Sequence, residues 1–265
     1  MAALAASLLA AAPLRAATSN TLDSEGGTIR LVAAAPEADG TVPAVLDIRL
    51  APGWKTYWRD PGASGLAPSV TLPPESGFAL DGIGFPPPRL FDDGTVRYVG
   101  YDRPVALPLR LKRLAPQARR LDLSVLLGIC KEICIPVQGD LALTLDEGPH
   151  DRPLDRARIK DAAKWLPEPP SEDFRLQAAQ ASDDGRRIDI RVALPEGGGE
   201  APEVFVAAPD GYAVHMPVAR AVTGRTMTAR IDVLRRPKGK PLDLAAIHIV
   251  VRAGARSMET PLAFE

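Results

Sequence analysis

Cysteine is scarce in this chain, with two residues among 265, and three histidines and 5% aromatic residues complete a sparse set of reactive groups. The formal net charge of −1 gives no global electrostatic attraction to nucleic acid or to anionic membranes. The sequence lacks a Gly-x-Ser-x-Gly elbow, a phosphate-binding loop and a His-Glu-x-x-His motif. The common signatures of serine hydrolases, P-loop nucleotidases and zinc peptidases are therefore absent.

Long hydrophobic runs are confined to the N-terminus. Residues 1–12 are nearly all alanine and leucine, which suits the apolar part of a signal peptide but is too short to span a bilayer. Ala16 and Ala17 offer a cleavage region, although no Lys or Arg precedes the run. We interpret residues 1–19 as a signal-peptide-like segment; the alternative is a disordered Ala-rich tail. Export would place a soluble protein in a compartment where disulfides persist.

Proline, in contrast, is abundant: 27 residues of 265, against an average usage of roughly 5%. Long helices are disfavoured because proline interrupts them. Period-two alternation of apolar and polar residues predicts short strands separated by turn clusters. The predicted strands are 28–34, 44–50, 69–72, 105–111, 121–129 and 140–145, then 174–179, 187–194, 203–207, 225–233, 246–252 and 259–264.

One helix is predicted over residues 154–166, ended by Pro167. Its apolar face would hold Ile159, Ala162, Ala163 and Leu166. We predict an all-β fold of two antiparallel β-sandwich domains joined by this helix and a Pro-rich linker. The expected boundaries are 20–147 for the first sandwich, 148–173 for the helix and linker, and 174–265 for the second sandwich.

A weak internal repeat relates the two halves. The run LDLSVLLG from Leu121 is echoed by LDLAAIHI from Leu242, and two other pairs of segments keep the same order. Either a duplication or chance similarity between β-rich segments would account for this repeat. The second copy has no cysteine, so the sandwich itself does not require one.

Both cysteines lie in one short run, GICKEICIP, as Cys130 and Cys134. The alternation places them at the ends of two strands joined by residues 131–133, so their Cα atoms could lie within the roughly 4.4–6.8 Å that a disulfide needs. A bridge would close a loop of about five residues, which the chain-entropy model credits with only about 2 kcal/mol. We predict a redox-active disulfide. A passive stabilising disulfide is the alternative.

Other polar patterns are weaker. A zinc site is a poor match, because none of the histidines lies near the cysteines in sequence (His150, His215, His248). Two basic clusters surround predicted turns: Arg110, Lys112, Arg113, Arg119 and Arg120, and then Arg235, Arg236, Lys238 and Lys240. They are either solvated hairpin ends or a docking patch for a membrane partner.

Residues from about Gly53 to Leu145 resemble the N-terminal domain of the thiol:disulfide interchange protein DsbD and its relative ScsB. The resembling pieces are PGWKTYWRDPG, SVTLPPESGF, YDRPVALPL and GICKEICIPVQGDLALTL, in this order. The resemblance implies an immunoglobulin-like sandwich in the periplasm. It also implies a cysteine pair that takes electrons from a membrane-embedded domain and passes them to thioredoxin-like proteins.

The resemblance further implies a protein-disulfide reductase in which Cys134 contacts the substrate disulfide and Cys130 resolves the mixed disulfide. The residues alone do not order the two. No membrane electron donor and no thioredoxin-like Cys-x-x-Cys domain is present in the sequence, so we expect a separate membrane donor. Beyond the redox-active disulfide we expect no cofactor, no metal and no nucleic acid. The competing function is a non-catalytic periplasmic binding or chaperone-like sandwich with a structural disulfide.

In this family an aromatic loop covers the cysteines and moves aside for the partner. The candidate here is the run Phe91-Asp92-Asp93-Gly94, with Phe91 as the shield and Gly94 as the point of bending; the alternative is an ordinary turn with Phe91 packed inward. Tyr57 and Tyr101 complete the expected surround.

Three aromatic residues lie within five positions, Trp54, Tyr57 and Trp58. They form either the floor beneath the cysteines or part of the sandwich core, which is the commoner use of aromatic side chains.

Overall fold

The computed structural model describes residues 18–62, 65–92, 97–145, 153–197, 201–217 and 220–263. Within these ranges the chain is mostly β, with one helix, and this confirms the all-β prediction. No helix in the described part of the chain is long and apolar enough to cross a membrane. Residues 1–17 of the predicted signal-peptide-like segment lie outside the described residues. Its last two positions instead begin strand β1 (Thr18–Ser24), which is a correction.

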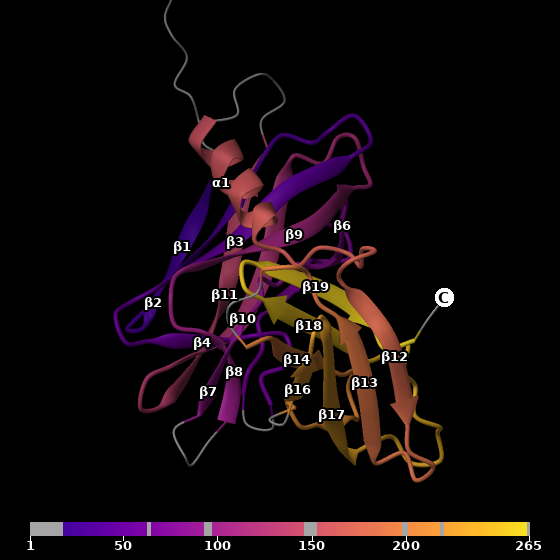
Figure 1. Cartoon of the computed structure of the whole chain (residues 1–265). Helices are drawn as coiled ribbons and strands as arrows, with labels where there is room; N and C mark the ends of the chain where they lie inside the picture. Colours follow the sequence, from indigo (N-terminus) through magenta and orange to yellow (C-terminus); the bar gives the residue numbers. More distant parts are fainter. Residues whose placement is uncertain are drawn as a thin grey trace, which may run out of the picture.

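Two antiparallel sheets form the N-terminal half, residues 18–145 (Figure 1, indigo to magenta). The first sheet runs in the order β1, β2 (Gly27–Ala33), β3 (Thr41–Leu50), β9 (Val105–Arg113) and β6 (Phe78–Ile83). The second runs β11 (Cys134–Thr144), β10 (Arg120–Cys130), β4 (Lys55–Tyr57), β8 (Arg97–Tyr101) and β7 (Arg89–Asp92), and β5 (Ser69–Thr71) also pairs with β10. Because side chains alternate along a strand, every second residue of β10 from Leu121 to Leu127 is buried in one apolar core.

The C-terminal half, residues 174–263, has two sheets of its own (Figure 1, orange to yellow). One runs β12 (Arg175–Ala181), β13 (Arg187–Ala193), β17 (Thr226–Arg235) and β15 (Ala213–Val214), with β16 (Arg220–Thr223) also pairing with β17. The other runs β14 (Glu203–Ala207), β18 (His248–Ala253) and β19 (Arg256–Pro261). A second apolar cluster, which includes Phe174, Ile188 and Ile249, fills this half.

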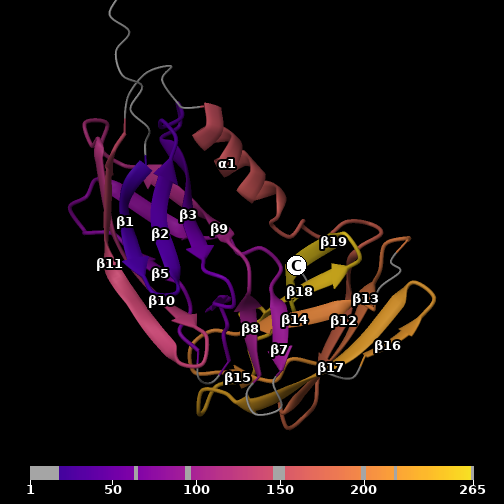
Figure 2. The same cartoon turned by 90° about the vertical axis from the view of Figure 1, so that its left-hand side faces the viewer.

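The two halves pack against each other directly (Figure 2). Phe205 of β14 and Val250 of β18 belong to the apolar cluster of the N-terminal half, although most of their neighbours in sequence belong to the other cluster. The edge of Phe205 meets the ring of Trp58, with ring centroids 6.3 Å apart. Apolar contact of this kind fixes the relative placement of the halves.

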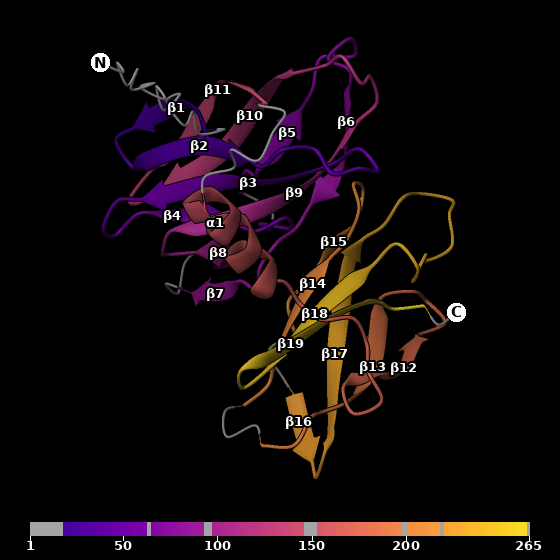
Figure 3. The ribbon, with the colours of Figure 1, turned by 90° about the horizontal axis from the view of Figure 1, so that it is seen from above.

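The predicted helix exists as α1 (Pro153–Lys164) and lies over the sheet that contains β3 and β9 (Figure 3). Ala162 is buried and Ile159 is partly buried, and both pack against valines of β2 and β3. Ala163, which we predicted on the apolar face, is exposed. The contact stripe of this short helix is therefore narrower than the predicted face.

A buried carboxylate fastens the helix to the sheet. Asp47 of β3 is 1% exposed and accepts hydrogen bonds from Arg30 at 2.9 Å and from Arg49 at 3.2 Å. Arg158 of α1 also donates to it. The buried charge is thus surrounded by guanidinium groups, which is the arrangement that a buried carboxylate requires.

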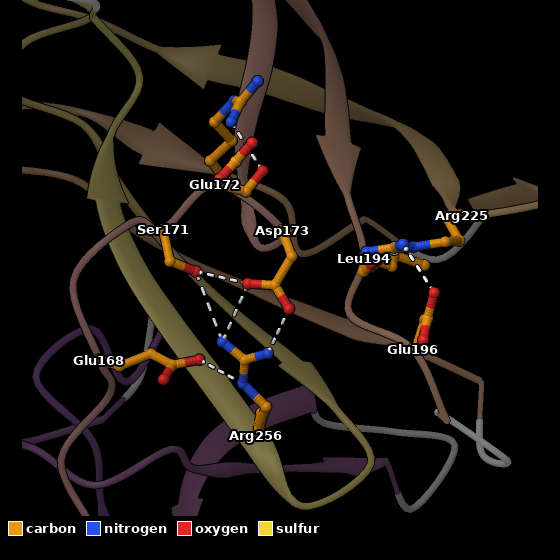
Figure 4. A network of polar contacts seen from close by, with 9 residues as sticks. Glu168, Ser171, Glu172, Asp173, Leu194, Glu196, Arg225 and Arg256 are labelled. Carbon is orange, nitrogen blue, oxygen red and sulfur yellow. Dashed lines mark hydrogen bonds and ion pairs between the residues drawn. The ribbon is translucent and has the colours of Figure 1, made fainter.

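The Pro-rich linker is fixed to β19 by Arg256 (Figure 4). Its guanidinium donates to Glu168 at 2.8 Å and to Asp173 at 2.7 Å, and the Ser171 hydroxyl donates to Asp173 at 2.9 Å. The hydrogen bonds from Arg256 and then from Ser171 lower the pKa of Asp173 to about 2. Glu168 also forms a parallel β-bridge with Met258, so this part of the linker is paired with β19.

Candidate functional site

The two cysteines close a hairpin. Cys130 ends β10, Cys134 begins β11, and the two are directly paired across the ladder. A disulfide joins them, with Cα atoms 4.1 Å apart, which is slightly closer than the range predicted from sequence. The Lys131 amide donates to the Ile133 carbonyl at 3.1 Å and completes the turn. The cysteines therefore flank the tight connection that the strand pattern predicts.

The two sulfur-bearing residues differ in exposure. Cys130 is 7% exposed, whereas Cys134 is an exposed residue, and its neighbour Ile133 is 70% exposed. Thiol–disulfide exchange requires an attacking thiolate to approach a disulfide sulfur in line with the bond. Cys134 is therefore the more exposed residue of the bridge.

A tyrosine hydroxyl lies against the bridge. The oxygen of Tyr57 is 3.0 Å from the Sγ of Cys134 and 3.2 Å from the Sγ of Cys130. Because disulfide sulfurs have no hydrogen, the hydroxyl is the donor. Burial, with a smaller contribution from Tyr98, raises the pKa of Tyr57, so it keeps its proton at neutral pH.

Local pairing and two glycines place this ring. Strand β4, which bears Tyr57, pairs with β10 so that Lys55 lies opposite Cys130. A Cβ atom on Gly128 would lie 2.9 Å from the Tyr57 ring, and one on Gly65 would lie 2.8 Å from it. Both distances are below normal contact, so the glycines leave the slot that the ring occupies.

Two more aromatic rings extend the site. Tyr98 of β8 meets Tyr57 edge-on at 5.8 Å between centroids, and Phe91 of β7 stacks on Tyr98 at 5.0 Å. The ammonium of Lys55 lies 5.1 Å from the Phe91 centroid and 5.3 Å from that of Tyr98, a cation–π arrangement. Tyr57, Tyr98 and Phe91 thus form a continuous aromatic row that begins at the sulfurs.

Asp92 and Tyr101, two other predicted surround residues, contact protein groups other than the sulfurs. Asp92 pairs with Arg97 at 2.6 Å, one strand position beyond Phe91. Tyr101 is buried, donates to the Pro86 carbonyl at 2.8 Å, and lies where the two halves meet. Gly94 lies outside the described residues.

Of the three clustered aromatic residues, Tyr57 contacts the sulfurs and Trp58 is fully buried in the core. Trp54 is 8% exposed in the same apolar cluster. Sequence reasoning missed Tyr98, Lys55, Gly65 and Gly128. The Tyr57/Gly128 fit has no sequence signal, because it depends on the register between β4 and β10. No group of three or more metal-ligating side chains occurs among the described residues.

The site lies in a region with known relatives. Residues 29–146 match the family described as "Thiol:disulfide interchange protein DsbD, N-terminal". This region is therefore similar to the DsbD N-terminal family. Both cysteines, Tyr57 and the aromatic row lie inside the DsbD match, so the disulfide lies in the region that resembles a thiol:disulfide interchange protein. The predicted resemblance is confirmed.

A solved structure extends the likeness in fold beyond the DsbD region. The chain resembles the N-terminal periplasmic domain of ScsB from Proteus mirabilis with a TM-score of 0.74 and 24% identity, over 92% of this chain and 97% of that chain. At this identity the likeness establishes the fold. Its coverage includes the C-terminal half, which the DsbD match does not reach. The search of curated proteins found no match.

Proposed function

We propose that this chain is a periplasmic protein-disulfide reductase module. In this proposal Cys130 and Cys134 relay electrons from a membrane-embedded thiol donor to the disulfides of thioredoxin-like or other periplasmic proteins. The observation that carries the proposal is the Cys130–Cys134 bridge itself, with an exposed Cys134 and the Tyr57 hydroxyl against both sulfurs.

Reduction begins when a donor thiolate attacks the Sγ of Cys134. The Cys130–Cys134 bond breaks, a mixed disulfide forms at Cys134, and Cys130 leaves as a thiolate. A leaving thiolate is stabilised by a hydrogen bond, which the Tyr57 hydroxyl can supply from 3.2 Å. The donor's second thiolate then attacks its own mixed-disulfide sulfur, which releases Cys134 as a thiolate and leaves the donor oxidised by two electrons.

Substrate reduction runs the same steps in the opposite direction. The Cys134 thiolate attacks a substrate disulfide and one substrate cysteine leaves as a thiolate. The Cys130 thiolate then attacks Cys134, restores the intramolecular disulfide, and releases the second substrate cysteine. The substrate gains two electrons and takes two protons from solvent. Residues 20–147 are proposed to form the exchange domain, with 148–173 as helix and linker and 174–265 as a second sandwich.

The reduction potential tests this function against a passive disulfide. Inert structural disulfides have potentials below about −300 mV, and we expect this one to lie well above that value in glutathione and dithiothreitol buffers. The reduced protein should also transfer its electrons to an oxidised thioredoxin-like protein. Alkylation of free thiols and mass spectrometry would measure this transfer. A potential at or below −300 mV without transfer would instead support the non-catalytic binding or chaperone-like function.

Phe91 is proposed to shield the bridge together with Asp92, as in the family. Replacing Phe91 with alanine removes the outer ring of the aromatic row, so we expect the oxidised protein to react several-fold faster with dithiothreitol. The matched control is Leu90→Ala, which alters the adjacent residue on the opposite side of β7 and should leave the rate unchanged. Equal rates for wild type and Phe91→Ala would remove Phe91 from the shield.

A further inference from the structure

The strand that bears Tyr57 continues directly into the contact between the two halves. Tyr57 contacts the sulfurs, and the next residue, Trp58, is fully buried against Phe205 of the C-terminal half. Successive side chains of an extended segment point to opposite sides, so Tyr57 faces the disulfide while Trp58 faces the other half. One stretch of backbone thus joins the two environments.

The following residues extend this contact. The Arg59 guanidinium donates to the Glu259 carboxylate of β19 at 2.5 Å and lies over the Trp58 ring at 4.7 Å. The Asp60 carboxylate accepts from the Ala208 amide at 3.0 Å. Three consecutive residues after Tyr57 therefore contact the C-terminal half through a ring, an ion pair and a hydrogen bond.

Of these three contacts, the Arg59–Glu259 ion pair should be the most costly to break. Arg59 is 25% exposed and Glu259 is 27% exposed, so water screens this pair less than a surface pair. The Nε and Nη2 atoms of Arg59 are buried without another partner in the described part of the chain, which leaves Glu259 as the carboxylate that balances this charge. Glu259 also lies 3.5 Å from Nδ1 of His248.

Backbone hydrogen bonds between β19 and the linker hold Glu259 in place. Its amide donates to the Glu168 carbonyl at 3.0 Å, and the Glu168 amide donates to the Ser257 carbonyl at 2.8 Å. The Arg256 network of Figure 4 holds the same linker segment. The carboxylate that Arg59 contacts is thus held by both the linker and β19.

Strand β4 is short, and the Thr56 hydroxyl anchors it to β10 by donating to the Gly128 carbonyl at 2.8 Å. It has three residues, with two register pairs to β10 and two to β8. A displacement of about 1 Å would take the Tyr57 oxygen beyond hydrogen-bonding distance of sulfur. Contacts after residue 57 therefore help to decide whether the hydroxyl reaches the bridge.

We infer that the C-terminal half acts as a positioning element for the redox site: through Trp58, Arg59 and Asp60 it holds the Tyr57 hydroxyl on the cysteine pair. Arg59 and Glu259 are positioning residues that contact neither sulfur nor substrate. This inference rests on the proposed exchange function, and it assigns to the cysteine-free half a role in setting cysteine reactivity.

The test measures alkylation of Cys134 by iodoacetamide in the reduced full-length protein as a function of pH. Glu259→Gln should slow alkylation about threefold at pH 7 and move the midpoint of the profile to higher pH, because the hydrogen bond to the thiolate is weakened. Asp189→Asn is the matched control. It breaks the ion pair with Arg230, which joins β13 to β17 in the other sheet of the C-terminal half, and it should leave the profile unchanged.

A double-mutant cycle separates positioning from general loosening. In a Tyr57→Phe background, Glu259→Gln should have no further effect on the profile, since the hydroxyl that it positions is gone. A wild-type profile for Glu259→Gln, or an equal slowing in the Tyr57→Phe background, would overturn the inference. If Glu259→Gln does not fold, Glu259→Asp, which draws the carboxylate back by one methylene, takes its place. Electron transfer from the wild-type protein to an oxidised thioredoxin-like protein is measured in parallel, and its absence would overturn the proposed function instead.

Discussion

Cys134→Ser is expected to form no mixed disulfide with an oxidised thioredoxin-like protein, whereas Cys130→Ser should accumulate one. The exposed Cys134 can reach a partner's sulfur, while Cys130 is 7% exposed behind it. In Cys130→Ser the resolving thiolate is missing, so the mixed disulfide at Cys134 persists. Non-reducing electrophoresis and mass spectrometry of the linked peptides would identify the bond.

This pair of variants is also internally controlled, because each removes one thiol from the same hairpin and both lose the same small loop. A mixed disulfide through Cys130 in Cys134→Ser would reverse the assignment of roles. Equal trapping by both variants would mean that exposure does not select the attacking sulfur. The double serine variant should trap nothing and should fold like wild type, since the disulfide closes a loop of only about five residues.

The hairpin could be predicted from the sequence because it depends only on residues that are close together along the chain. Alternation over Leu121 to Ile129 fixes one strand, and a three-residue connection then brings Cys130 opposite Cys134. Strand β14, Glu203–Ala207, matches its predicted bounds for the same reason. Alternation alone marks the next strand only over residues 140–145, but the hairpin interpretation already places a descending strand from Ile135. Strand β11 begins at Cys134, because the ladder to β10 continues through Pro136 and Gly139 despite their poor strand propensity.

The short strands around the cysteines could not be predicted in this way. Strands β4, β7 and β8 are three to five residues long, and alternation is not measurable over so few positions. They exist because neighbouring strands offer them backbone partners, which is a tertiary effect. The aromatic row depends on this arrangement, and for that reason Tyr98 was missed while Tyr57, which lies near the cysteines only through β4–β10 pairing, was named on resemblance.

Tyr57→Phe is expected to give the second large effect. It removes the hydroxyl 3.0 Å from Cys134 and keeps the ring in the slot beside Gly65 and Gly128. A hydrogen bond to a charged group contributes about 1.5–3 kcal/mol, so its loss should raise the pKa of the Cys134 thiol. The sign follows because the bond stabilises the thiolate and does nothing comparable for the thiol.

The rate should change less than the thiolate fraction, because a more basic thiolate is also the better nucleophile, with a Brønsted coefficient of about 0.5. At pH 7 we therefore expect alkylation of reduced Tyr57→Phe to be roughly three- to tenfold slower than wild type. Above both pKa values the order should reverse, so the two pH–rate profiles cross. Tyr98→Phe is the matched control, since it removes a hydroxyl from the next ring without altering the contact with sulfur. Profiles that coincide at every pH would show that the hydroxyl does not act on Cys134, and parallel profiles without a crossing would assign the slowing to access rather than to thiolate stabilisation.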